Sequence, residues 1–292
     1  MKSVMLAGLA ALVLALPMEA AAQAPALPAA IFTDPPSDKA HPARMVVLHI
    51  PSGGVQINGV AYVAAGAGPH PTVILFHGLP GNEKNLDLAQ AIRRAGWTVV
   101  TLNYRGSWGS PGAYSFAGDL EDAKAALAFV RAPANAERLQ IDTARLVLAG
   151  HSLGGWVTAM TAAQDPGVKG AVLISAADMG GMGKLPRKAV GLEMADNMES
   201  LAGTSPQAMA EEIVSHADAF ALKNAIPGLA GRPLLVLGAD DGLAQGTDAL
   251  VAAIRARGGK QVTTRHVATD HGWSDRRIAL EAAVIGWLQG VK

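Results

Sequence analysis

Short apolar runs alternate with helical patterns along the chain from Arg44 onward. Residues 72–76 form a nearly continuous apolar run, which is typical of a strand buried on both faces. Residues 86–95 instead place apolar side chains at helical spacing and are followed by Gly96, a residue type that often ends helices. Strands separated by helices predict a mostly parallel central sheet with helices on both faces, where sites lie at the carboxyl ends of the strands.

The same patterns predict the elements of the rest of the chain. Strands are expected at residues 45–50, 60–64, 72–76, 98–102, 145–149, 171–175, 234–237 and 262–267. Helices are expected at residues 86–95, 116–131, from the serine turn to Ala163, 247–257 and 275–288. The first two strands are expected to pair across the turn at residues 52–54, and residues 178–227 form an insertion of helical character between two core strands.

The order of residues at the N-terminus predicts a secretory signal peptide. Lys2 is followed by an apolar run that ends at Leu16 and then by small residues. The run is too short to span a bilayer, so we expect cleavage after Ala22 and a periplasmic or secreted protein without a membrane span. A flexible leader at residues 23–43, rich in proline and alanine, is then expected to precede a single domain at residues 44–292.

Charge and cysteine content narrow the possible partners. The chain has 24 lysines and arginines against 24 aspartates and glutamates, which gives no general attraction to nucleic acid or an anionic membrane. It has no cysteine, so a disulfide framework is impossible. A small neutral or modestly charged substrate is therefore the expected partner, and no nucleic acid is expected; oligomeric state is left open.

The stretch Gly150-His151-Ser152-Leu153-Gly154 carries the clearest chemical signal in the chain. It follows a predicted strand and precedes a predicted helix, which is the context of a nucleophile elbow, a sharp turn that exposes a serine hydroxyl. Glycines suit the crowded positions of such a turn because they have no Cβ. A serine that merely capped the helix would not need this pattern, so Ser152 is the predicted nucleophile.

A serine nucleophile needs a general base, and the base needs an orienting acid. His271 follows the last predicted strand and is the predicted base. Asp241 follows the preceding strand and is favoured as the acid, because nucleophile, acid and histidine then occur in the chain order used by serine hydrolases with an α/β sheet. Asp240 and Asp178 also lie beyond strand ends and remain alternatives.

Hydrolysis of an acyl group also needs hydrogen-bond donors where negative charge develops on the substrate oxygen. The segment HGLPG at residues 77–81 follows a predicted strand, and its glycines permit a backbone whose N–H groups face a ligand. We therefore expect the backbone N–H groups of Leu79 and Leu153 to form an oxyanion hole. The serine would attack an acyl carbonyl, the histidine would pass the proton to the leaving group, and water would release the acyl-enzyme. This chemistry requires no metal and no cofactor.

Five segments of the chain resemble successive landmarks of the α/β-hydrolase superfamily across residues 44–292. They are HGLPG, NYRGSWGSPG, GHSLGG, LGADDG and TDHGW. The resemblance implies the α/β-hydrolase fold, esterase or peptidase chemistry, a triad of Ser152, Asp241 and His271, and oxyanion donors at Leu79 and Leu153. The chain is similar to esterase, dienelactone-hydrolase and prolyl-oligopeptidase-like branches, and its GHSLGG elbow looks more like that of general esterases and lipases.

The resemblance further implies that the insertion at residues 178–227 is a small helical cap over the pocket. Methionines are concentrated there, and flexible thioether side chains suit an adaptable apolar acyl site as well as they suit gap filling. We predict that Met179, Met182 and Met194 bind substrate and that Trp108 forms another wall of the pocket.

The predicted function is that of a serine hydrolase that cleaves carboxylic esters of small molecules. A serine peptidase or amidase with the same triad is the alternative, and a binding protein without catalysis is a third hypothesis. Complete phosphate-loop, GxGxxG and HExxH motifs are absent from the sequence.

Overall fold

Eight strands form one central sheet in the order β1-β2-β4-β3-β5-β6-β7-β8. The computed structural model describes residues 26–291, so the predicted signal peptide lies outside the described residues. The strands are β1 (Arg44–Ser52), β2 (Val55–Val63), β3 (His70–Phe76), β4 (Thr98–Leu102), β5 (Ile141–His151), β6 (Val168–Ile174), β7 (Leu234–Ala239) and β8 (Val262–Val267). β2 runs antiparallel to β1 and β4, and the other neighbouring strands are parallel, which confirms the mostly parallel sheet predicted from the sequence.

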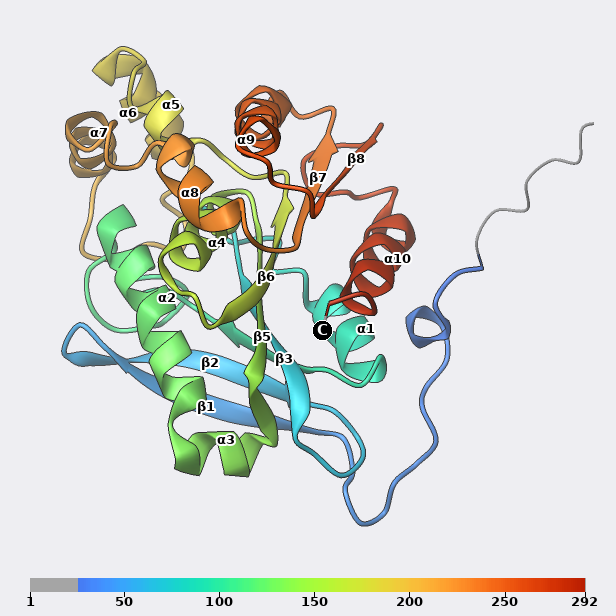
Figure 1. The fold of residues 1–292 in the computed structure, drawn as a ribbon. Coiled ribbons are helices and arrows are strands. Elements are labelled where there is room, and N and C mark those ends of the chain that lie inside the picture. Colours follow the sequence, from blue (N-terminus) through green and yellow to red (C-terminus); the bar gives the residue numbers. More distant parts are fainter. Residues whose placement is uncertain (1–25, 292) are drawn as a thin grey trace, which may run out of the picture.

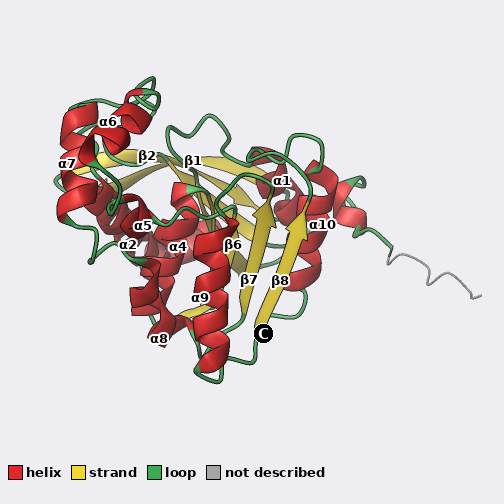
Figure 2. Ribbon diagram, turned by 90° about the horizontal axis from the view of Figure 1, so that it is seen from above, coloured by secondary structure: helices red, strands yellow, loops and turns green. Residues whose placement is uncertain are grey.

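Helices cover both faces of this sheet, as Figures 1 and 2 show. One face is covered by α1 (Leu86–Arg94) and α10 (Arg277–Leu288), and the other by α2 (Phe116–Arg131), α4 (Leu153–Gln164), α8 (Ile226–Leu229) and α9 (Ala244–Ala256). The remaining helices are α3 (Pro133–Leu139), α5 (Met179–Met182), α6 (Arg187–Ala195), α7 (Pro206–Ser215) and the short 3-10 turns η1 (Ala29–Ile31) and η2 (Leu222–Ala225).

The two helical layers explain why central strands such as β3 are apolar along their whole length. Val73 and Leu75 pack into the core beneath α1 and α10, whereas Ile74 and Phe76 pack into the core on the opposite face. Successive side chains of a strand point to opposite faces, so a strand covered on both sides must be apolar at every position.

Several elements differ from those expected from the sequence: β5 begins at Ile141 rather than at residue 145, and α9 begins at Ala244 rather than at residue 247. β2 begins at Val55 rather than at residue 60, and it includes Asn58 and Gly59, residue types that seldom favour strands. A Cβ at Gly59 would lie 2.6 Å from the carbonyl oxygen of Thr101, so glycine allows β2 to approach β4 closely. The helix α3 was not expected; it begins at Pro133, a residue type well suited to the first position of a helix.

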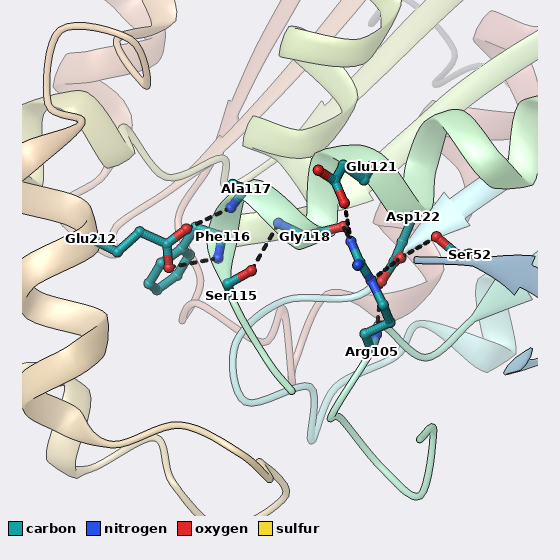
Figure 3. Close-up of polar contacts among 9 residues, drawn as sticks. All are labelled: Ser52, Arg105, Ser115, Phe116, Ala117, Gly118, Glu121, Asp122 and Glu212. Carbon is teal, nitrogen blue, oxygen red and sulfur yellow. Dashed lines mark hydrogen bonds and ion pairs between the residues drawn. The ribbon is translucent and has the colours of Figure 1, made fainter. Parts of the chain in front are cut away.

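The insertion between β6 and β7 is helical, and α5, α6 and α7 lie at a corner of the molecule away from α1 and α10 (Figure 1). Glu212 of α7 accepts hydrogen bonds from the backbone N–H groups of Phe116 (3.1 Å) and Ala117 (2.8 Å), at the beginning of α2 (Figure 3). The cap residue Ser115 accepts the N–H of Gly118 at 3.0 Å. A carboxylate at a helix N-terminus is stabilised by the helix dipole, so this contact fastens the insertion to the core.

A buried ion pair connects α2 to the loop after β4 and to the end of β1 (Figure 3). The Asp122 side chain is fully buried and accepts hydrogen bonds from the Arg105 backbone N–H (2.7 Å), Arg105 Nε (2.7 Å) and Ser52 Oγ (2.5 Å). Glu121 contacts the same guanidinium but is 65% exposed. Removing one member of a buried pair leaves an uncompensated charge, whereas an exposed pair contributes little.

We expect Asp122→Ala to lower the free energy of unfolding by about 3–5 kcal/mol. Glu121→Gln is the matched control, since it removes a carboxylate from the same arginine in solvent, and should cost less than about 1 kcal/mol. Urea denaturation of the three proteins measures both effects. Equal losses for the two variants would contradict the role assigned to the buried pair.

Candidate active site

Ser152 lies at the apex of a strained turn between β5 and α4. Its φ of 56° and ψ of −120° fall outside the backbone conformations that residues other than glycine commonly adopt. The turn is held by the end of β6, because the Ser152 N–H donates to the Ile174 carbonyl at 2.9 Å and the Ser152 carbonyl accepts from the Ala177 N–H at 3.0 Å. Backbone strain of this kind persists only where its surroundings enforce it, which makes Ser152 a candidate nucleophile.

The glycines on both sides of Ser152 permit close packing of the turn. A Cβ at Gly150 would collide with the carbonyl oxygen of Gly154, and a Cβ at Gly154 would collide with the carbonyl oxygen of Phe76 at the end of β3. Both are backbone contacts, which a side-chain rotation cannot relieve. The glycines therefore allow α4 to begin directly against β3 and β5.

The structure brings His271 and Asp241 together at the carboxyl ends of β8 and β7. His271 Nδ1 lies 2.9 Å from Asp241 Oδ2, with the Asp241 side chain 3% exposed and that of His271 42% exposed. Burial raises the pKa of Asp241, but hydrogen bonds from His271, the Leu243 N–H and Ser175 outweigh it and hold that pKa below its ordinary value. With Nδ1 facing a carboxylate, Nε2 is the ring nitrogen left for proton transfer.

The two alternative acids have other partners. Asp240 Oδ1 lies 2.7 Å from His266 Nε2, and both side chains are exposed. Asp178 Oδ1 accepts the backbone N–H of Leu222 at 3.5 Å. The geometry thus favours Asp241 over its neighbour in sequence and over Asp178.

Two further contacts, which the sequence did not indicate, hold the loop that carries His271. His151 Nε2 lies 2.8 Å from the His271 carbonyl oxygen, and the two rings are 4.6 Å apart between centroids. Burial and the nearby His271 lower the pKa of His151 to about 4, so at neutral pH its ring is uncharged and Nε2–H donates to that carbonyl. The buried Trp273 donates its indole N–H to Ser175 Oγ at 3.1 Å, and Ser175 is one of the groups that lower the pKa of Asp241.

A cavity of about 310 Å³ contains the candidate catalytic side chains. Ser152, Asp241 and His271 line it together with Leu79 and Leu153 and with the predicted substrate-binding residues Met179, Met182 and Met194. It is also lined by four residues that the sequence did not indicate: Ala177, Glu193, Asn197 and Leu243. Glu193 and Asn197 are four positions apart, and residues at this spacing lie on the same face of a helix. This spacing is the signal in the sequence that could have indicated that the two side chains lie together.

Both candidate oxyanion donors belong to segments that lie close to the serine turn. Leu153 is the first residue of α4, and N–H groups of a first helical turn have no partner within the helix. The segment that carries Leu79 passes close to the nucleophile, since a Cβ at Gly78 would lie 3.0 Å from Ser152 Cβ. Both residues line the cavity, so their N–H groups are candidates to bind a substrate oxygen there.

Trp108, which was expected to form a wall of the pocket, is not among the residues that line the cavity. Its indole N–H donates to the Pro80 carbonyl at 2.6 Å, and its ring lies 4.2 Å from Lys84 Nζ. The indole N–H thus finds its acceptor in the backbone next to Leu79. Trp108 therefore contacts the segment that carries the candidate oxyanion donor Leu79.

No three histidine, aspartate or glutamate side chains within residues 26–291 are grouped so that they could hold a metal ion. In the same part of the chain, no helix has the length and apolar character needed to cross a membrane.

Two comparisons with known proteins indicate what the chain is similar to. An uncharacterised protein of Mycobacterium tuberculosis is 29% identical over 133 residues, which are 45% of this chain and 46% of that protein, so the chain spans about half the length of the curated relative. An esterase of Pyrobaculum calidifontis has a TM-score of 0.65 at 20% identity, with 86% of this chain and 87% of that chain covered. An acylaminoacyl peptidase of Pyrococcus horikoshii has a TM-score of 0.63 at 15% identity, with 85% and 41% covered.

The similarity to these solved structures shows the fold and confirms the fold class predicted from the sequence. A family model described as alpha/beta hydrolase fold matches residues 71–234, more than half of the 292-residue chain, and includes β3 through the start of β7. The matched region carries the serine turn, and the eight-stranded sheet has helices on both faces. The chain belongs to the α/β-hydrolase family.

Proposed function

We propose that the protein is a serine carboxylesterase that cleaves esters of small molecules through an acyl-enzyme. The observation that carries the proposal is the hydrogen-bonded pair of His271 and Asp241, 2.9 Å apart, in the same cavity as the strained Ser152. A nucleophile, a base and an orienting acid are the parts that acyl transfer requires. The fold similarity to a Pyrobaculum calidifontis esterase agrees with this chemistry.

In the proposed mechanism, the Ser152 hydroxyl attacks the ester carbonyl while His271 Nε2 accepts its proton. Asp241 stabilises the charged imidazole that forms, and the N–H groups of Leu79 and Leu153 bind the oxyanion. The protonated His271 then gives its proton to the departing alcohol. Water, activated by the same histidine, attacks the acyl-enzyme and releases the acid.

The cavity favours a small apolar acyl group. Its volume of about 310 Å³ lies at the low end for ligand sites, and three methionines, Met179, Met182 and Met194, are among the residues that line it. A peptide substrate would need several fixed hydrogen-bond partners for its backbone, which methionine side chains do not provide. We also propose that the enzyme acts in the periplasm or outside the cell, on the basis of the residue order at positions 1–22.

We expect kcat/KM for unactivated methyl and ethyl esters of short acids to exceed that for an unactivated dipeptide by roughly 10²-fold or more. An amine must be protonated as it leaves, so amide cleavage depends more heavily on general-acid catalysis than ester cleavage does. The measurement uses purified protein, p-nitrophenyl esters, alanyl and prolyl p-nitroanilides, and the unactivated substrates side by side.

Ser152→Ala is the control for contaminating hydrolases in this comparison. If unactivated peptides and unactivated esters were hydrolysed at comparable rates, the proposed function would have to be changed from esterase to serine peptidase. If the folded protein hydrolysed neither esters nor amides, the proposed activity would be wrong, although the α/β-hydrolase fold would stand.

A further inference from the structure

The charged side chains around the candidate cavity are all acidic or belong to the catalytic pair. Glu193 and Asp241 are its two carboxylates, His271 is bonded to Asp241, and no lysine or arginine lines it within residues 26–291. Arg187, the basic residue at the beginning of α6, pairs with Glu211 of α7 rather than with Glu193 of its own helix. Glu193 therefore gives the cavity a negative charge, and within residues 26–291 no lysine or arginine forms an ion pair with it.

Asn197, the other polar residue of the insertion that lines the cavity, adds a hydrogen-bond acceptor beside Glu193. Asn197 Nδ2 donates to the Glu193 backbone carbonyl at 2.8 Å. Because a carbonyl oxygen can only accept a hydrogen bond, the amide nitrogen of Asn197, and not its oxygen, must face this carbonyl. Asn197 Oδ1, a hydrogen-bond acceptor, is left for a ligand, together with the second N–H of the amide. The remaining cap residues that line the cavity are Met179, Met182 and Met194, which are apolar.

We propose that the substrates are esters whose acyl chain is apolar near the carbonyl and carries an ammonium group at its far end. This inference rests on the proposed esterase function and names the substrate class for the same site. The apolar part of the chain packs against the methionines, and the cation is attracted by Glu193. An acyl chain that ends in a carboxylate is repelled by the same residue and finds no cation among the lining side chains.

The test compares three p-nitrophenyl esters: that of γ-trimethylammoniobutyrate, that of its uncharged isostere with a tert-butyl group in place of the trimethylammonium group, and the hemiester of glutarate. The first two have the same shape, so their ratio of kcat/KM reports charge alone. Because the Glu193 side chain is exposed to solvent, we expect the cationic ester to be favoured by about threefold over the isostere, and the anionic ester to be the poorest substrate of the three.

Glu193→Gln should bring the ratio of the cationic ester to its isostere close to one, and Glu193→Lys should favour the isostere over the cationic ester and raise the relative rate of the anionic ester. Asp196→Asn is the matched control, because it removes an exposed carboxylate three residues away that does not line the cavity, and should leave both ratios unchanged. Ratios near one in the wild type, or equal effects of Glu193→Gln and Asp196→Asn, would overturn the inference. Hydrolysis of the uncharged ester separates this failure from that of the esterase proposal, which requires turnover of that ester.

Discussion

Ser152→Ala abolishes ester hydrolysis, with a loss in kcat of about 10⁶ if the serine turn serves the proposed chemistry. Alanine keeps the small Cβ that the turn already accommodates and removes only the hydroxyl. No acyl-enzyme can then form, and His271 and the candidate oxyanion donors are left with no nucleophile to activate. The measurement is steady-state turnover of p-nitrophenyl butyrate by the purified variant, with its fold checked by circular dichroism.

Ser215→Ala provides the matched serine control. Ser215 Oγ bonds backbone carbonyls of its own helix at the exposed end of α7 and does not line the cavity, so its loss should leave turnover unchanged. Retention by Ser152→Ala of more than a small fraction of wild-type activity would contradict the nucleophile assignment.

Asp241→Asn lowers kcat by about 10⁴ in the proposed mechanism, as expected when a triad loses its acid. The substitution keeps the shape of a side chain that is 3% exposed, so packing is preserved. An amide N–H at this position donates to His271 Nδ1, which moves the imidazole proton to Nε2. The nitrogen that should accept the proton of Ser152 is then occupied, and the imidazolium formed during attack has no carboxylate beside it.

Asp240→Asn and Asp178→Asn are the controls for this effect, because both acids follow strand ends and neither contacts His271. Each should retain activity within a few-fold of the wild type. A larger loss for Asp178→Asn than for Asp241→Asn would show that the orienting acid is assigned to the wrong residue. Equal losses for Asp240→Asn and Asp241→Asn would contradict the geometric distinction between the neighbours.

Most strands and the placement of the candidate site could be predicted because strong local patterns marked them. The apolar run of β3 is required by a sheet with helices on both faces, and Ser152, Asp241 and His271 each follow a strand of that sheet. In a mostly parallel sheet, residues beyond the carboxyl ends of strands gather at one edge. The structure brings these three residues to one cavity, while their catalytic roles stay predictions.

The parts that could not be predicted depend on contacts between distant segments. Asp240 and Asp241 are adjacent in sequence, and only the packed loop directs the first toward His266 and the second toward His271. The support of that loop by Trp273 and Ser175 joins residues 98 positions apart, and no local pattern marks it. The hydrogen bond from Trp108 to Pro80 likewise joins residues 28 positions apart, and no local pattern marks it.

The most direct test of the central claim is to identify the residue that an organophosphonate modifies. Intact-mass and peptide mass spectrometry of the inhibited protein should show one adduct, located on Ser152, and its extent should match the loss of ester hydrolysis. His271 and Asp241 should both be needed for rapid labelling, and Ser152→Ala should remain unmodified. Complete inhibition with the adduct on any other residue would contradict the claim that Ser152 is the nucleophile of this hydrolase.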